Sequence, residues 1–131
     1  MLHLDTSIVV AYLRGSAVVA RMLSRHRDEV SMSSIVLAEL VYGALASSRP
    51  DANLTSLGKL HAIIPVVDFD RDAAEAYGRL RITLRKKGLP TGETDAFIAA
   101  TAIAHRATLV THNVKHFDRI EALTVVDWLV G

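Results

Sequence analysis

The chain contains 131 residues, of which 50% are hydrophobic and 22% are charged. This size fits one compact domain, and the composition excludes intrinsically disordered and low-complexity proteins. Fifteen Lys and Arg residues and fourteen Asp and Glu residues leave a net charge of +1, so any contact with nucleic acid must come from local basic patches. The sequence contains no cysteine, which excludes disulfides, cysteine-bound zinc and thiol nucleophiles.

No segment of the sequence predicts export or insertion into a membrane. Asp5 falls where a secretory signal would need an uninterrupted apolar stretch. Every long apolar run is interrupted well before the roughly 20 residues that span a bilayer. We therefore expect a cytoplasmic protein that does not contact membranes. The high hydrophobicity of so short a chain also suggests apolar surface that a second copy or a partner covers.

Short strand patterns alternate with helical patterns along the whole chain. In chain order, the predicted elements are strand 2–4, helix 8–13, helix 17–27, strand 30–33, helix 35–46, helix 53–63, strand 64–67, helix 70–87, helix 95–105, strand 108–111 and strand 124–126. This alternation is typical of a parallel sheet covered by helices on both faces. We therefore expect an α/β protein with three α/β/α layers around a parallel sheet of four to five strands.

Four oxygen-bearing side chains fall close to the ends of the predicted strands. Asp5 follows the first strand, Glu39 lies in the helix after the second, Asp95 begins a later helix, and Asn113 follows strand 108–111. In open parallel sheets, functional groups collect at the carboxyl ends of the strands. We therefore expect these four side chains to converge on one edge of the sheet.

Each of these residues has an ordinary explanation when it is considered alone. Asp5 could cap the first helix, and Asn113 could be a turn residue. Asp95 could be favoured by the helix dipole, typically by about 0.3 to 1 kcal/mol. Glu39 is the only charge between residues 35 and 46. Burying it unpaired would cost several kcal/mol, so it needs a partner or a place that faces water.

Together, the three carboxylates favour a metal site. They repel one another at a shared edge, and no Lys or Arg lies within two positions of any of them. Oxygen ligands select Mg²⁺ or Mn²⁺ rather than zinc, and such an ion suits phosphodiester hydrolysis by a metal-activated water. The glycine-rich loops of the common nucleotide-binding motifs are absent from the sequence.

Several segments together resemble the motif series of PIN-domain ribonucleases, in their order and spacing as well as in their residues. They are Leu4–Ser7, Ala38–Leu40, Gly92–Ala100 and Leu109–Asn113 followed by Phe117. Within that superfamily, the small size and the ending Leu123–Trp128 most resemble VapC toxins of VapBC toxin–antitoxin systems. The similarity covers essentially the whole chain, so we expect residues 1–131 to form a single PIN domain.

The resemblance implies an endoribonuclease that depends on Mg²⁺ or Mn²⁺. Asp5, Glu39 and Asp95 would bind the metal, and Asn113 would complete the catalytic set. Asn113 stands where many PIN domains have a fourth acid and others have Asn, so one tightly held ion is expected. At the substrate, Thr111 is expected to bond a carboxylate or water, and Lys115 to neutralise RNA phosphates.

The resemblance further implies an RNA substrate, homodimerisation and inhibition by a cognate VapB-type antitoxin that binds in a groove near the site. Two alternatives stay open at this point. A receiver-like α/β binding domain would need paired acids after its first strand and a Lys after a late strand, but Asp5 is single and no Lys follows strand 108–111 directly. A catalytically inactive PIN-like interaction module is the other alternative, although all three main acids are present.

Overall fold

The computed structural model describes residues 1–89 and 91–130, and within them the strands form one parallel five-stranded sheet. The strands are β1 (Leu2–Leu4), β2 (Val30–Ser33), β3 (Val66–Val67), β4 (Thr108–Val110) and β5 (Val125–Val126). Their order across the sheet is β3-β2-β1-β4-β5, and each neighbouring pair is parallel. The sheet confirms the predicted α/β class, and β1 lies at its centre.

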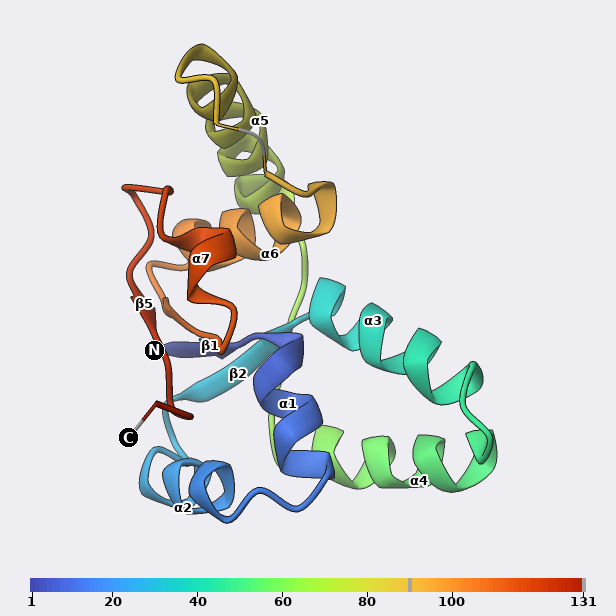
Figure 1. Ribbon diagram of the computed structural model, residues 1–131. Coiled ribbons are helices and arrows are strands. Elements are labelled where there is room, and N and C mark those ends of the chain that lie inside the picture. Colours follow the sequence, from blue (N-terminus) through green and yellow to red (C-terminus); the bar gives the residue numbers. More distant parts are fainter. Residues whose placement is uncertain (90, 131) are drawn as a thin grey trace.

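Helices cover both faces of this sheet, as Figure 1 shows. They are α1 (Thr6–Leu13), α2 (Ala17–Arg25), α3 (Ser34–Leu45), α4 (Pro50–His61), α5 (Arg71–Lys86), α6 (Glu93–Ala104) and α7 (Val114–Phe117). The chain moves across the sheet in one direction from β1 to β3 and then returns to β4. Because crossovers between parallel strands are right-handed, this reversal puts the helices on opposite faces. In Figure 1, α1, α2 and α4 lie on one side of the strands, and α5, α6 and α7 lie on the other.

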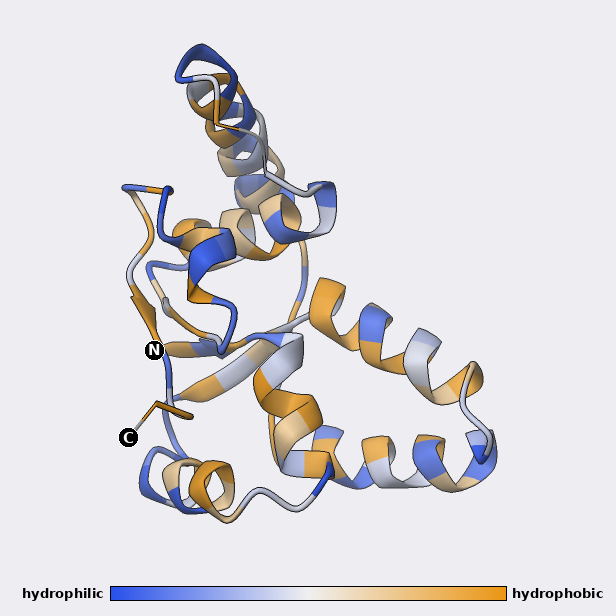
Figure 2. Ribbon diagram, viewed as in Figure 1, coloured by the Kyte–Doolittle hydropathy of each residue, from blue (hydrophilic) through white to orange (hydrophobic). Residues whose placement is uncertain are grey.

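The three-layer arrangement follows from where the apolar residues lie. All four residues of β2 are buried, as expected for a strand covered on both faces. The largest side chains of the core include Leu4, Met32, Leu109 and Phe117, none more than 1% exposed. Figure 2 shows that α1 is mostly hydrophobic, whereas the outer end of α5 is hydrophilic. The central strands are thus fixed by burial on both faces.

Some element boundaries differ from the sequence-based expectations. The short helix α7 was not predicted, because four residues are too few to produce a helical periodicity. Helix α4 begins at Pro50 rather than Asn53, since proline is well tolerated in the first turn of a helix. Helix α6 begins at Glu93, two residues before the expected start, so Asp95 is its third residue.

Some apolar surface remains after the core is filled. On α3, Tyr42 is 75% exposed and Leu45 is 58% exposed.

Among the residues that the structure describes, no single helix is long and apolar enough to cross a bilayer. The helices Thr6–Leu13 and Ala17–Arg25 meet these two criteria only when they are counted together, and the chain bends by 113° between them.

Candidate active site

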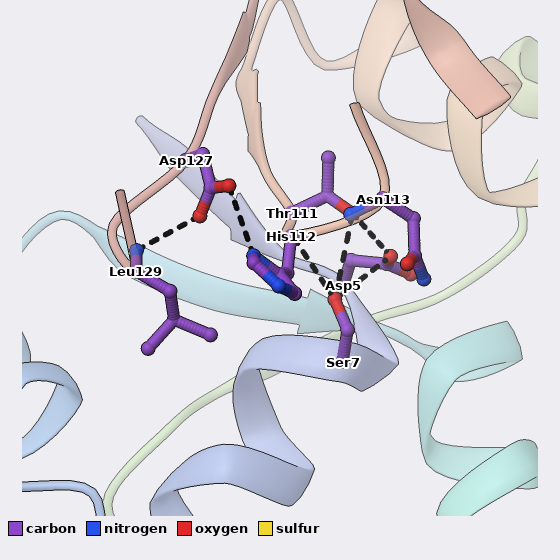
Figure 3. Close-up of polar contacts among 7 residues, drawn as sticks. All are labelled: Asp5, Ser7, Thr111, His112, Asn113, Asp127 and Leu129. Carbon is purple, nitrogen blue, oxygen red and sulfur yellow. Dashed lines mark hydrogen bonds and ion pairs between the residues drawn. The ribbon is translucent and has the colours of Figure 1, made fainter. Parts of the chain in front are cut away.

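Asp5 lies at the centre of the carboxyl edge of the sheet, directly after β1, and is only 4% exposed. It occupies the N-cap position of α1, yet its side chain makes no capping hydrogen bond. Instead its Oδ2 accepts hydrogen bonds from the hydroxyls of Thr111, at 2.6 Å, and Ser7, at 3.3 Å (Figure 3). The explanation of Asp5 as a helix cap is therefore wrong, because its carboxylate is held against the end of β4.

Two consecutive backbone amides orient the hydroxyls that hold Asp5. The amide of His112 donates to Ser7 Oγ at 3.1 Å, and the amide of Asn113 donates to Thr111 Oγ1 at 3.0 Å. A hydroxyl that accepts one hydrogen bond can still donate its own proton to another group. Both hydroxyls can thus direct their protons toward Asp5, and the loop after β4 controls the orientation of that carboxylate.

Asp95 lies in the first turn of α6, and its side chain is 30% exposed. Partial burial raises the pKa of its carboxyl group, the nearby His116 opposes this, and the negative charge of Asp5 raises the pKa further. His116 Nδ1 is 3.3 Å from Asp95 Oδ2. The influence of Asp5 means that these two carboxylates are close enough to repel, as expected of groups that share a cation.

Glu39 has both of the features that the sequence required of it, a place that faces water and a hydrogen-bond partner. It is exposed, together with its neighbour Ala38, whereas Leu40 faces the core. Adjacent helical residues point about 100° apart, so a largely apolar helix can still present one carboxylate to solvent. The predicted partner is present: the hydroxyl of Thr6, the residue after Asp5, donates to Glu39 Oε1 at 2.6 Å. This bond connects α3 to the start of α1.

The structure brings the predicted acids to one region without gathering them around a single point. Asp5 and Asp95 interact electrostatically, while Glu39 reaches the same edge through Thr6. In the described part of the chain, no three His, Asp or Glu side chains are close enough together to hold one metal ion. The oxygen atoms of Asp5 and Asp95 nevertheless form the type of donor set that suits a hard divalent cation.

The other predicted site residues differ in their exposure. Thr111 is fully buried, at 0% exposure, so its side chain has no surface that RNA could reach. Asn113 is exposed at the N-cap of α7, where its side chain makes no capping hydrogen bond. Lys115 is exposed on α7, immediately beyond that loop.

Sequence reasoning assigned no role to three residues that contact the acids. Thr6 and Ser7 belong to the motif that contains Asp5, and their hydroxyls at the start of a helix were the available signal. His116 is exposed on α7, and its contact with Asp95 was not predicted. That pair depends on α7, whose four residues left no periodic signal.

Comparisons with known proteins agree with this architecture. The family described as PIN domain matches residues 2–123. Ribonuclease VapC2 of Rickettsia felis is 42% identical over 101 residues, which cover 77% of this chain and 75% of that protein. The tRNA(fMet)-specific endonuclease VapC of Shigella flexneri is 33% identical over 126 residues, covering 95% of this chain and 96% of that protein.

Solved structures give the same result. The crystal structure of VapBC2 from Rickettsia felis, bound to a DNA fragment from its promoter, contains a chain that superposes with a TM-score of 0.92 and 37% identity, covering 98% of this chain and 99% of that one. DNA-bound VapBC from Salmonella typhimurium gives a TM-score of 0.93 and 31% identity, covering 97% of each chain.

The parallel sheet with acidic side chains at its carboxyl edge and the family match over most of the chain together define the PIN-domain class. The chain belongs to the PIN-domain family and, within it, to the VapC proteins. This membership favours a PIN domain over the receiver-like alternative.

Proposed function

We propose that this protein is an endoribonuclease toxin of a VapBC toxin–antitoxin system, acting on RNA with Mg²⁺ or Mn²⁺ at the carboxyl edge of the sheet. One observation supports this most strongly: Asp5 is buried and held by two hydroxyls, and its charge raises the pKa of the nearby Asp95. Relatives that are similar over most of their length are named ribonuclease or tRNA(fMet)-specific endonuclease. The proposal takes residues 1–131 as a single PIN domain.

In this proposal, the oxygen atoms of Asp5, Glu39 and Asp95 hold the metal. When bound, a divalent ion lowers the pKa of its water and polarises the phosphoryl oxygen. The bond from Thr111 and the weaker bond from Ser7 both end on Asp5 Oδ2, so Oδ1 accepts no hydrogen bond from the described residues. Asp5 is therefore fixed in orientation while one of its oxygens stays available as a ligand.

The remaining site residues take supporting roles. Because Thr111 is fully buried, its proposed role is to orient Asp5 rather than to contact RNA. Asn113 contributes a neutral amide to the catalytic set, which favours one tightly held ion. Lys115 is exposed on α7, beside the loop after β4, and would neutralise phosphates of the RNA backbone.

The partner in this proposal is a VapB-type antitoxin, supported by the similarity to chains in VapBC complexes. A groove of about 530 Å³ adjoins the site and is lined by Thr6, Leu13, Glu39, Tyr42 and Leu57, among others. An apolar segment seated there would cover exposed Tyr42 and lie against Glu39. Homodimerisation would cover further apolar surface. In this proposal the protein acts on RNA in the cytoplasm.

The test is cleavage of RNA by the purified protein in the presence of Mg²⁺ or Mn²⁺. Changing groups that only orient metal ligands costs about 10- to 100-fold in activity. Asp5→Asn, Glu39→Gln and Asp95→Asn each remove a ligand charge, so each should reduce the cleavage rate at least about 100-fold without unfolding the protein. EDTA should abolish cleavage by the parent.

Asp72→Asn is the matched control, because Asp72 is an exposed acid in the first turn of α5, as Asp95 is in the first turn of α6. It should cleave RNA at the parental rate. Parental rates in any two of the three acid variants would refute the proposed site. A folded parent that does not cleave RNA with either metal would favour the inactive interaction module.

A further inference from the structure

The segment after β5 is fastened to the loop that follows β4. The side chain of Asp127 is only 10% exposed, and its two oxygens have different partners. Oδ1 accepts the backbone amide of Leu129 at 2.8 Å, and Oδ2 is 3.0 Å from His112 Nδ1 (Figure 3). Trp128, which lies between Asp127 and Leu129 in the sequence, is 8% exposed and stacks on His26. Asp127 is thus held firmly on an anchored segment.

His112 connects this anchored segment to the acidic site. In Figure 3, the contact from its ring runs to Asp127, and the contact from its backbone runs to Ser7. Ser7 in turn donates to Asp5 Oδ2. A continuous series of hydrogen bonds therefore leads from the segment after the last strand to the most buried acid of the site.

We propose that Asp127 and His112 are positioning residues for Asp5, acting through the backbone of the loop after β4 and the hydroxyl of Ser7. This inference rests on the proposed nuclease function. The bond to Asp127 restrains His112, so the His112 amide keeps its geometry toward Ser7. Small displacements of catalytic groups cost large factors in rate, and such groups are held in place by the hydrogen bonds of their neighbours.

A second role for a His–Asp pair is general acid–base catalysis, in which the carboxylate fixes the tautomer of the imidazole. The side chain of His112 is 55% exposed, and the ring nitrogen that has a partner is Nδ1, which is directed at Asp127. The positioning role needs only a hydrogen bond of either polarity between the two side chains. The catalytic role needs the negative charge of Asp127.

The experiment measures kcat and KM for RNA cleavage at saturating metal. Asp127→Ala and His112→Ala should each lower kcat about 10- to 100-fold with little change in KM, and the double variant should be no slower than either single one. In a Ser7→Ala background, Asp127→Ala should have no further effect, because the series of bonds is already broken. Asp127→Asn should recover most of kcat and keep the parental pH profile, since its amide can bond both partners.

A parental kcat in Asp127→Ala would overturn the inference. So would a double variant of Asp127→Ala and Ser7→Ala whose loss of kcat is the product of the two single losses. Loss of kcat in Asp127→Asn equal to that in Asp127→Ala, with a changed pH profile, would also overturn it in favour of acid–base catalysis. Glu75→Gln removes one partner of an exposed ion pair with Arg71 on α5 and is the control, expected to match the parent.

Amide hydrogen exchange provides a readout that does not need nuclease activity. The amide of His112 should exchange at least about 10-fold faster in Asp127→Ala than in the parent, and at the parental rate in Glu75→Gln. If the parent does not cleave RNA, the proposed function fails, and this exchange rate still decides whether Asp127 restrains the loop. An unchanged rate in Asp127→Ala would overturn the inference by itself.

Discussion

At the scale of single residues, Asp5 and Glu39 occupy contrasting surroundings at the same edge of the sheet. Asp5 is buried and held by the hydroxyls of Thr111 and Ser7, whereas Glu39 is exposed and bonded to Thr6. A fixed ligand such as Asp5 loses little conformational entropy when an ion binds. Glu39 can change partners at small cost, because its present bond is exposed.

Asn113 offers a test of how many ions the site holds. Asn113→Asp adds a negative charge next to the loop that orients Asp5, and affinity for divalent cations rises with the number of charged oxygen ligands. We expect the variant to bind Mn²⁺ more tightly than the parent, by calorimetric titration of both proteins in one buffer. Asn53→Asp, which changes the other asparagine of the chain, on α4, is the control. Unchanged affinity and stoichiometry in Asn113→Asp would mean that Asn113 does not face the metal.

His3 predicts how stability depends on pH. Burial, then the nearby His105, then the N-terminal amine lower the pKa of His3 from 6.5 to about 4. Above pH 6.5 the His3 ring is mostly neutral in both the folded and the unfolded protein. As the pH falls from about 6.5 to 4, the unfolded chain binds a proton that the folded protein excludes, so the free energy of unfolding falls.

The expected loss is about 2 kcal/mol between pH 7 and 5, because each pKa unit corresponds to about 1.4 kcal/mol. Urea unfolding at both pH values measures it. His3→Leu should lose less free energy of unfolding than the parent between these pH values. His61→Gln, which changes an exposed histidine of α4, should lose as much as the parent. An equal loss in His3→Leu and the parent would contradict this account.

At the scale of elements, α3 carries Glu39 and starts directly after β2. Ser33 caps this helix by accepting the amide of Val36 at 3.2 Å, and the bond is buried. Ser33→Ala should lower the free energy of unfolding by about 1 kcal/mol, as measured in urea, because it leaves a helix amide without its acceptor. Ser48→Ala, in the exposed turn after α3, should unfold like the parent. Equal stability of Ser33→Ala and the parent would show that the cap is not required.

The elements that the sequence predicted best are those with strong local signals. The alternation that includes Val30 and Met32 predicts the position of β2, and the capping preference of serine predicts that α3 starts beside Ser33 or Ser34. The helix α7 lacked such a signal, and the hydroxyl partner of Glu39 lies on a segment that is distant in the sequence. Neither can be obtained from local periodicity, because both depend on tertiary packing.

At the scale of the whole molecule, the order of the strands explains how acids far apart in sequence meet. β1 lies between β2 and β4, so the chain after each of these three central strands reaches the same edge. Alternation of strands and helices predicted this convergence in general terms. The individual partners, such as His116 for Asp95 and Thr6 for Glu39, required the structure, because side-chain pairing between distant segments has no sequence period.

The central claim is that the acids at this edge form one divalent-metal site, and calorimetric titration with Mn²⁺ tests it most directly. The parent should bind about one equivalent, and Asp95→Asn should bind at least about 10-fold more weakly, because it removes one of three ligand charges. Asp72→Asn, the matched control on α5, should bind like the parent. Equal affinity and stoichiometry in Asp95→Asn and the parent, or no binding by the parent at millimolar Mn²⁺, would contradict the account.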